Sequence, residues 1–158
     1  MILDRRCVTR DTLSPLIKLD VRPDQRDLVS PNLKTLAEAP YAPGSRVWGL
    51  WAGPTPVGLM AMVDPAGVRA QGPVVAPGAA YLWRLMIAAD QQGKGYGMQA
   101  VAFAIQTARD WHAPRMVVGV SDAAHGNRGF YERLGFRDSG TIEDDDRLFV
   151  LDLPDVKE

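Results

Sequence analysis

The sequence is poor in cysteine, and Cys7 is the only one among 158 residues. A single cysteine excludes a disulfide within the chain and suits a reducing compartment. No stretch approaches the roughly 18 apolar residues that a membrane-spanning helix needs. The start, residues 1–6, lacks the apolar core of a signal peptide. These absences predict a cytoplasmic protein with no membrane partner.

An excess of either charge is also missing. The chain has 18 basic and 19 acidic residues, which gives a formal net charge of −1. This balance provides no electrostatic reason to expect nucleic acid as a partner. No internal repeat or low-complexity tract divides the chain, and its length is typical of one domain with a sizeable core. We therefore predict a single domain over residues 1–158.

The most informative segment is a glycine-rich loop, QGKGYG, at positions 92–97. It follows an apolar run over residues 82–87 and precedes an amphipathic segment that begins near Met98. Glycines at a strand-to-helix junction leave backbone N–H groups uncovered, and the helix start adds unpaired donors and the positive end of its dipole. Lys94 adds a positive charge. The loop is therefore expected to bind an anion such as pyrophosphate.

Other well-known glycine loops fit less well. A nucleotide P-loop would end in Gly-Lys-Ser/Thr, which this loop lacks. The dinucleotide fingerprint needs Gly-x-Gly-x-x-Gly and an acidic residue about 20 positions on, whereas these glycines stand at 93, 95 and 97. A glycine-rich turn that only caps a helix stays an alternative for this loop taken alone.

A second motif makes the interpretation more specific. The segment GFYERLGF at positions 129–136 contains Tyr-x-x-x-Gly-Phe, and the loop contains Gln-x-x-Gly-x-Gly. In this order and at this separation, the two motifs resemble the acetyl-coenzyme A loop and the tyrosine signature of the GNAT family of N-acetyltransferases. The resemblance covers most of the chain and is strongest between Tyr81 and Phe136.

The resemblance implies an acetyl-CoA-dependent N-acetyltransferase that needs no metal. It implies that Tyr131 lies near the coenzyme sulfur and protonates the departing thiolate; the alternative is a core tyrosine packed among its neighbours. It also implies that the main chain near Met86 and Ile87 supplies the oxyanion donor and contacts to pantetheine. The residues expected to bind the coenzyme are Met86, Ile87, Gln92, Gly93, Lys94, Gly95, Tyr96, Gly97, Met98, Asn127 and Phe130.

Asn127 departs from the pattern of the family. Many members place an asparagine seven residues before the tyrosine, where it contacts the pantetheine arm; here that position is Ala124. Asn127 stands four residues before Tyr131. It either replaces the usual contact or is the N-cap of a short helix.

The general base is left open among several groups. Glu38 is preferred to Asp64 and Glu132, because in relatives its segment borders the acceptor pocket. His125 is a further candidate. Arg84 lies on a predicted buried strand and needs an acidic partner. A carboxylate that serves as this partner leaves the set of candidate bases.

The acceptor is expected to be a primary amine of a small molecule. Residues 33–39 and 81–87 resemble a bacterial branch of the family that contains spermidine and spermine acetyltransferases, so polyamines are the first candidates. Tyr41, Trp48, Trp51 and Trp83 are candidate walls for a cation, or else pack in the core and the hairpin. Drug-like amines, amino acids and peptide N-termini stay open. The resemblance is also compatible with a homodimer.

A protein of another class would keep the fold and bind acetyl-CoA without transferring the acetyl group, as a sensor or regulator. The intact Tyr131 beside an intact glycine loop argues against this class. A thiol-release assay over a panel of amines separates the two.

Hydrophobic periodicity predicts the order β-α-α-β-β-β-α-β-α-β-β. Strands are expected at 5–8, 47–51, 57–63, 81–87, 116–120, 136–142 and 147–153, and helices at 12–19, 31–39, 98–111 and 127–134. Thr12 is the expected first N-cap, and the second helix is expected to carry Leu33, Leu36 and Ala37 on one face. Residues 64–78 are expected to form a long loop with a strand extension. A mixed α/β sheet flanked by helices follows, which is also the GNAT fold.

Overall fold

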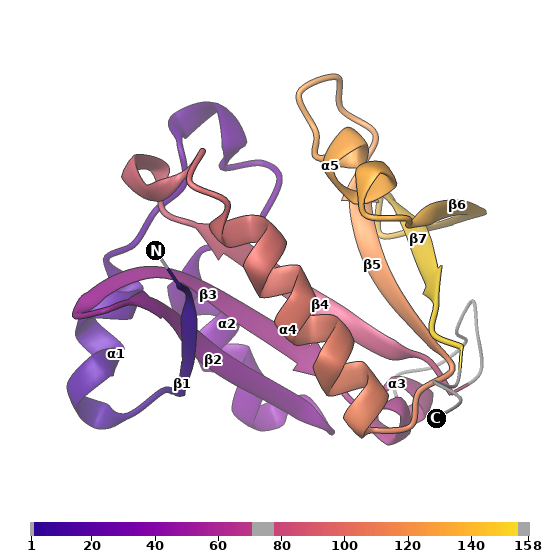
Figure 1. Cartoon of the computed structure of the whole chain (residues 1–158), viewed down its shortest axis with the longest axis horizontal. Coiled ribbons are helices and arrows are strands. Elements are labelled where there is room, and N and C mark those ends of the chain that lie inside the picture. Colours follow the sequence, from indigo (N-terminus) through magenta and orange to yellow (C-terminus); the bar gives the residue numbers. More distant parts are fainter. Residues whose placement is uncertain (1, 71–77, 155–158) are drawn as a thin grey trace.

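A computed structural model describes residues 2–70 and 78–154 of the chain. Its centre is a sheet of seven strands in the order β1-β2-β3-β4-β5-β7-β6 (Figure 1). Neighbouring strands are antiparallel except β4 and β5, which are parallel. The strands are β1 Asp4–Cys7, β2 Ser45–Ala52, β3 Thr55–Val63, β4 Ala80–Ile87, β5 Arg115–Ser121, β6 Arg137–Glu143 and β7 Asp146–Asp152.

Helices cover both faces of this sheet. The long α4 crosses one face, while α1 and α2 lie on the other (Figure 1). The largest cluster of buried side chains lies between α4 and the sheet, so the predicted mixed α/β fold is confirmed. The helices are α1 Arg10–Ile17, α2 Asn32–Glu38, α3 Pro65–Ala70, α4 Tyr96–Asp110 and α5 Arg128–Arg133, with 3₁₀ turns at Pro23–Gln25, Ala39–Tyr41 and Ala89–Gln91.

The first helix begins earlier than predicted. Thr9 is its N-cap: the Thr9 hydroxyl accepts a hydrogen bond from Thr12 N at 3.3 Å, and the Thr12 hydroxyl accepts one from Thr9 N at 2.9 Å. This capping box satisfies two backbone donors at once. The prediction that Thr12 is the cap is wrong: Thr12 is the third residue of the helix, and Thr9, which has the same hydroxyl, precedes its first turn. Pro15 consequently lies inside the helix.

The second helix buries polar rather than apolar side chains. Asn32 and Thr35 are 3% and 1% exposed, whereas Leu33 is 59% exposed. Asn32 Nδ2 donates a hydrogen bond to the Leu16 carbonyl oxygen at 2.9 Å, and the Thr35 hydroxyl accepts one from Arg84 at 3.0 Å. Polar groups with such partners can be buried at little cost. Ala37 is exposed as well, whereas Leu36 packs against the buried cluster on this face of the sheet. The predicted apolar face is therefore wrong for Leu33 and Ala37, because a count of apolar residues misses hydrogen-bonded polar ones.

Part of the predicted loop at 64–78 is a helix, α3. Asp64 Oδ1 accepts a hydrogen bond from Gly67 N at 2.8 Å, and Pro65 is the first helical residue. A side-chain cap and a proline at this position both favour a helix start. The six residues of α3 are too few for a readable apolar period. Residues 71–77, where the predicted loop continues, lie outside the described residues.

Strand β4 contains a β-bulge at Trp83. Leu82 pairs with Met62 and Arg84 pairs with Ala61, so the pairing skips Trp83. Because side chains alternate across a strand, one extra residue moves all those that follow to the opposite face. Arg84 is thereby turned away from the core beneath α4 and toward α2, where its hydrogen-bond partners lie.

Strands β4 and β5 separate soon after they meet. Only Ala80, Tyr81 and Leu82 pair with β5, opposite residues 116–118. A bulge increases the local twist of its strand, and beyond Leu82 the two strands diverge toward the top of Figure 1. The opening lies toward the carboxyl ends of two neighbouring parallel strands, where sheets of this kind commonly bind ligands.

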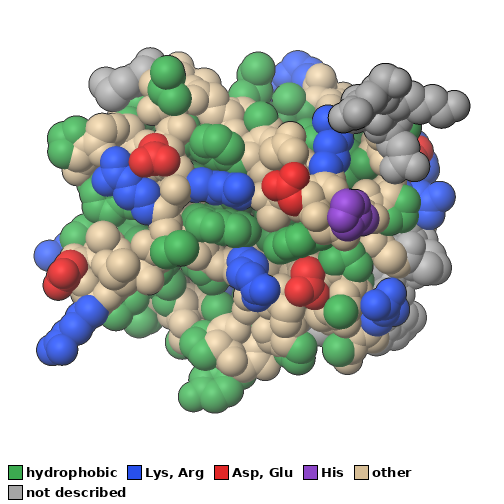
Figure 2. Space-filling view, turned by 60° about the horizontal axis from the view of Figure 1, so that its bottom comes forward, with side chains coloured by type: hydrophobic (Ala, Val, Ile, Leu, Met, Phe, Trp, Pro, Cys, Tyr) green, Lys and Arg blue, Asp and Glu red, His purple; other side chains and the backbone are tan. Residues whose placement is uncertain are grey.

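Charges of both signs are mixed on one face of the molecule (Figure 2). Figure 2 shows acidic and basic side chains interspersed over the face that it displays. This agrees with the net charge of −1. In the described ranges, no helix combines the length and the apolar character that crossing a membrane would require.

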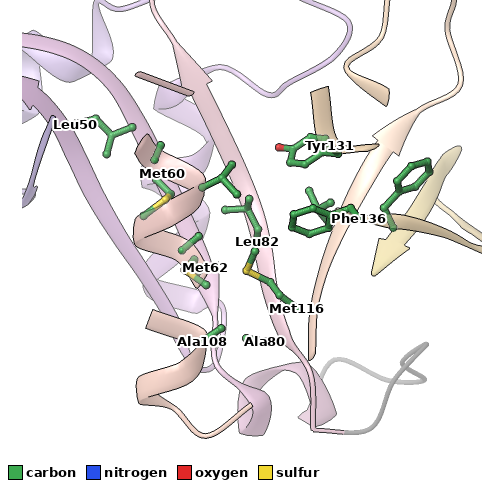
Figure 3. Close-up of a cluster of buried hydrophobic side chains, with 14 of the residues drawn as sticks. Leu50, Met60, Met62, Ala80, Leu82, Ala108, Met116, Tyr131 and Phe136 are labelled. Carbon is green, nitrogen blue, oxygen red and sulfur yellow. The ribbon is translucent and has the colours of Figure 1, made fainter. Parts of the chain in front are cut away.

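Leu82→Ala is expected to destabilise the fold strongly. Leu82 is 1% exposed and belongs to the core beneath α4 together with Met62 and Met116 (Figure 3). Loss of a buried leucine side chain lowers the free energy of unfolding by about 2–5 kcal/mol. Leu33→Ala makes the same chemical change at an exposed position and is expected to cost at most about 0.5 kcal/mol. Urea unfolding followed by circular dichroism measures both, and equal losses would contradict this core.

Candidate functional site

Two cavities meet where β4 and β5 diverge. The loop cavity, of about 390 Å³, extends from the glycine loop to α5. The acidic cavity, of about 300 Å³, extends along β4, β5 and the turn between β6 and β7. A group held in one cavity can meet a group held in the other at the residues that line both. These shared residues are Leu28, Val29, Leu85, Asn127 and Tyr131.

The glycine loop forms one wall of the loop cavity. Gly93 and Gly95 have left-handed φ values of 77° and 84°, and nothing lies within 4 Å of a Cβ built on either. Such backbone angles favour glycine. Gly95 is the N-cap of α4 and provides no side-chain cap for its first N–H groups. These donors and the positive end of the helix dipole are therefore available to an anion.

Two polar side chains of this loop have protein partners. Gln92 Nε2 donates to the Ile87 carbonyl oxygen at 2.9 Å and to Gln25 Oε1 at 2.8 Å. Gln92 thus ties the loop to the end of β4 and to the segment before α2. Lys94 Nζ donates to Gln91 Oε1 at 3.1 Å, and Lys94 does not line the loop cavity. The Gln92 side chain therefore positions the loop, whose main chain is left for a ligand.

Tyr131 is held by the turn that ends α5. Gly135 has a φ of 96° and its N–H donates to the Glu132 carbonyl oxygen at 3.0 Å. The Phe136 N–H donates to the Tyr131 carbonyl oxygen at 3.1 Å, which completes a Schellman C-cap. The Tyr131 ring meets Phe130 and Phe136 edge to face, with centroids 5.0 and 5.4 Å away. The Tyr-x-x-x-Gly-Phe spacing is thus a helix stop that fixes an aromatic ring.

The Tyr131 hydroxyl is directed into the site. Its residue is 3% exposed but lines both cavities, and in Figure 3 the hydroxyl points away from Phe136 and toward β4. Within the described part of the chain the hydroxyl has no hydrogen-bond partner, and it is open to the cavities rather than sealed in the core. Burial, and secondarily Tyr81, raise the pKa of Tyr131. The group therefore stays protonated and can act as a donor.

The acidic cavity takes its charge from the turn between β6 and β7. Glu143, Asp144 and Asp146 line it together with Tyr81 and Gly119. A Cβ built on Gly119 would lie 3.2 Å from Asp146 Oδ2 and 3.6 Å from the Tyr81 hydroxyl oxygen. The glycine therefore keeps the space between these two side chains open. In the described ranges, no three or more His, Cys, Asp or Glu side chains are grouped to hold a metal ion.

The electrostatics of this cavity follow from burial and like charge. Burial, then Glu143 and Asp146, raise the pKa of Tyr81 to about 12, although Arg84 opposes the shift. Burial, then its neighbours Asp145 and Asp144, raise the pKa of Asp146. Burial disfavours charge of either sign, but the neighbouring carboxylates favour a cation in this cavity.

Glu38 is the acidic partner that Arg84 requires. Arg84 Nη2 donates to Glu38 Oε2 at 3.3 Å, and the ring of Trp83 lies 4.5 Å from the guanidinium carbon. Lys34 also forms an ion pair with Glu38. The Lys34 hydrogen bond first, and then Arg84, lower the pKa of Glu38 despite some burial. Glu38 lines neither cavity. Its role as the base stays a prediction, and its ion pairs with Arg84 and Lys34 argue against that role.

The other candidate carboxylates also have partners away from the cavities. Asp64 caps α3 through Gly67, and Glu132 Oε1 accepts a hydrogen bond from Arg128 Nε at 2.7 Å on the surface of α5. Neither Asp64 nor Glu132 lines a cavity. Both carboxylates therefore have structural roles.

Two segments that are far apart in the sequence are in contact beside the site. His125 Nε2 lies 3.0 Å from both carboxylate oxygens of Asp27. The nearby Leu28 and Asn127 line both cavities. Asn127 occupies the N-cap position of α5, but its side chain makes no capping hydrogen bond. The cap interpretation of Asn127 is therefore correct in position only.

Most residues expected to bind the coenzyme come together. Lys94 is the exception, and the other ten line the loop cavity: Met86, Ile87, Gln92, Gly93, Gly95, Tyr96, Gly97, Met98, Asn127 and Phe130. Sequence reasoning missed the segment between α1 and α2, which adds Val21, Gln25, Leu28 and Val29. This segment carries no motif, and only long-range contacts such as that between Asp27 and His125 bring it to the site.

Only one of the four aromatic residues expected as walls for a cation lies at the site. Trp83 lines the acidic cavity, where Tyr81 joins it. Trp48 and Trp51 instead pack beneath arginines of β1, with ring centroids 4.9 and 5.1 Å from the guanidinium carbons. Tyr41 is 87% exposed. The alternative of structural packing therefore holds for Trp48 and Trp51.

Solved acetyltransferases share this fold. An aminoglycoside 6′-acetyltransferase type Ii superposes with a TM-score of 0.71 over 99% of this chain and 100% of its own, at 15% identity. The PaiA N-acetyltransferase of Thermoplasma acidophilum, solved in complex with coenzyme A, gives 0.70 over 97% and 100%, at 14% identity. An acetyltransferase of Thermus thermophilus gives 0.70 over 97% and 98%, at 23% identity.

The sequence itself identifies the family. A sequence profile of the Acetyltransferase (GNAT) family matches residues 16–136, well over half of the chain. The chain therefore belongs to the GNAT family of acetyltransferases, as its two motifs predict. No curated protein matches the sequence.

Proposed function

We propose that the protein transfers the acetyl group of acetyl-CoA directly to a primary amine of a small cationic molecule. One observation carries this proposal: Tyr131, a buried proton donor, lines both cavities where they meet. One cavity has an uncapped helix start that suits pyrophosphate. The other has carboxylates that suit an ammonium group.

The loop cavity fits acetyl-CoA as the acetyl donor. Backbone N–H groups of the glycine loop and of the first turn of α4 would hold the pyrophosphate. Apolar side chains such as Leu85, Met86 and Phe130 suit the pantetheine arm. The main chain near Met86 and Ile87 would donate to the oxyanion of the tetrahedral intermediate. The PaiA neighbour, with the same fold, was solved with coenzyme A.

Direct transfer of the acetyl group requires few further groups from the protein. A neutral amine attacks the thioester carbonyl, and the departing thiolate needs a proton. Tyr131 is suited to supply it, because its raised pKa keeps the hydroxyl protonated. In this assignment Glu38 is a positioning residue that holds Arg84 beside the acidic cavity.

A polyamine is the first candidate for the acceptor. Three carboxylates line the acidic cavity, whereas its cation Arg84 is paired with Glu38. Trp83 and Tyr81 add aromatic faces that favour cations. The resemblance of residues 33–39 and 81–87 to spermidine and spermine acetyltransferases supports the same choice. An aminoglycoside is a second polycation of this kind, suggested by the fold neighbour.

We further propose that residues 1–158 act as one catalytic domain. β1 and β7, from opposite ends of the described chain, belong to the same sheet. A cytoplasmic location stays a prediction from the single cysteine. A homodimer stays a prediction from the family resemblance.

Gly95→Asp is expected to weaken coenzyme A binding about tenfold or more, since about 1.4 kcal/mol of repulsion between the carboxylate and phosphate suffices. Gly140→Asp is a matched control. Gly140 has a φ of 83°, has nothing within 4 Å of a built Cβ, and lines neither cavity. Isothermal titration calorimetry measures both dissociation constants. Equal affinities in the two variants would rule out the phosphate site.

Tyr131→Phe is expected to lower kcat by about 10²-fold or more, because it removes a general acid and keeps the ring. Coenzyme A affinity should stay nearly unchanged, since the ring packing is preserved. Tyr41→Phe, which loses an exposed hydroxyl outside both cavities, should behave as wild type. Steady-state thiol release provides kcat. A wild-type kcat in Tyr131→Phe, with chemistry rate-limiting, would refute this role.

The acceptor is tested by thiol release with spermidine, spermine, short diamines, kanamycin and the weakly basic aniline. We expect the polycations to give the highest kcat/KM. If only aniline is acetylated, the cationic acceptor is wrong and acetyl transfer stands. If no amine releases thiol although coenzyme A binds, the protein is a sensor of the donor and not a transferase.

A further inference from the structure

We propose that Asp146 accepts the proton of the attacking amine in the acidic cavity. The inference rests on the proposed function and deepens it, because it names the base that acetyl transfer to an ammonium group requires. The sequence alone favours Glu38 for this role.

The backbone directs Asp146 into the cavity. Asp146 is the first residue of β7 and pairs with Ser121 of β5. Two residues on, Leu148 belongs to a cluster against which Tyr81 packs, so alternation places Asp146 on the same face of the sheet as that cluster. Asp146 Oδ2 then lies 3.2 Å from a Cβ built on Gly119. Any larger residue at position 119 would press on the carboxylate.

A second, independent feature indicates that the space beside Asp146 receives a ligand. Tyr131 is 3% exposed, yet its hydroxyl has no hydrogen-bond partner in the described ranges and lines the same cavity. No buried polar side-chain atom in the described ranges lacks a partner, so this hydroxyl is open to the cavity although the rest of its side chain is buried. A reacting group between Asp146 and Tyr131 would provide a partner.

The charges around Asp146 leave it free for an incoming cation. Its chain neighbour Arg147 bonds to Asp122 and Asp138 instead. Among the described residues, no ion pair engages Asp146 itself. The titratable and charged groups that line the same cavity are Tyr81 and Arg84 on β4, Tyr131 on α5, and Glu143 and Asp144 beside the turn, and Asp145 adjoins Asp146 in the chain.

The balance of these charges favours a base over a permanently ionised group. Arg84 is paired with Glu38 and lies at the cavity wall, so negative neighbours dominate around Asp146. Burial and the neighbouring carboxylates raise the pKa of Asp146. The raised pKa of Asp146 lies closer to the pKa of the amine, which makes proton transfer from the amine less unfavourable.

Atoms and charges balance in this transfer. The ammonium gives one proton to Asp146 Oδ2, and the nitrogen lone pair forms the C–N bond to the acetyl carbon. The C–S bond breaks, and the sulfur leaves with the proton of Tyr131. The nitrogen loses its second proton to solvent, and solvent restores Tyr131 and Asp146. The products are the N-acetyl amide, coenzyme A as the thiol, and one proton.

The pH dependence of kcat/KM distinguishes a base from a binding group. With Asp146 as the base, the wild-type protein uses the ammonium form of spermidine, so kcat/KM stays level from about pH 7 to 9. Asp146→Asn must use the free amine, which is scarce at neutral pH because alkylamines titrate at about pH 10. We expect this variant to lose about 10²-fold or more at pH 7 and to recover about tenfold per pH unit.

Asp145→Asn is the matched control, since it removes the adjacent charge from the same turn and Asp145 lines neither cavity. It should keep the level pH profile of the wild-type protein at a moderately lower rate, because the charge of Asp145 helps to raise the pKa of Asp146. Asp146→Glu restores a carboxylate and should restore a level profile at a lower rate. Calorimetry with coenzyme A verifies that each variant is folded and binds the donor.

Each outcome decides the proposal. A ratio of wild-type to Asp146→Asn kcat/KM that falls with rising pH supports it. A ratio that is constant over pH, whether large or near one, overturns it while acetyl transfer stands. Wild-type protein that acetylates none of spermidine, spermine, the short diamines and kanamycin refutes the proposed function itself and this inference with it.

Discussion

The short pairing between β4 and β5 is the constraint on which the rest of the site depends. The two strands share only three paired positions, and a bulge at Trp83 then turns β4 away. Parallel strands that stayed paired would close the sheet and leave no opening. Because they part, α5 can present Tyr131 to the opening from one side, and the β6–β7 turn can present its carboxylates from another.

The bulge also decides which charges reach the opening. By shifting the alternation of β4, it places Arg84 beside Thr35 and Glu38 of α2 instead of in the core beneath α4. Glu38 consequently neutralises an arginine. In the mechanism that we propose, the base therefore comes from another element, Asp146 at the start of β7.

Much of the coenzyme half of the site can be predicted from sequence because local backbone rules produce it. Gly93 and Gly95 have left-handed angles, the first N–H groups of α4 have no side-chain cap, and the Tyr-x-x-x-Gly-Phe motif is a Schellman cap. The acceptor half depends on long-range placement. Asp146 meets Tyr81 only because both flank Gly119, and Val29 reaches the site only through contacts made far along the chain. A bulge, buried Asn32 and Thr35, and a six-residue helix likewise leave no clear periodic signal.

The wall that both cavities share has a consequence for ligand design. Because five residues line both spaces, a single molecule can occupy them without crossing a solvent gap. Once its coenzyme-like end is bound, a tethered amine is held beside the carboxylates at an effective concentration that can reach the millimolar range. A bisubstrate conjugate of coenzyme A and a polycation would therefore gain affinity over either half without any new contact. Such a conjugate would draw its selectivity from the acidic cavity, since the coenzyme end suits the GNAT fold in general.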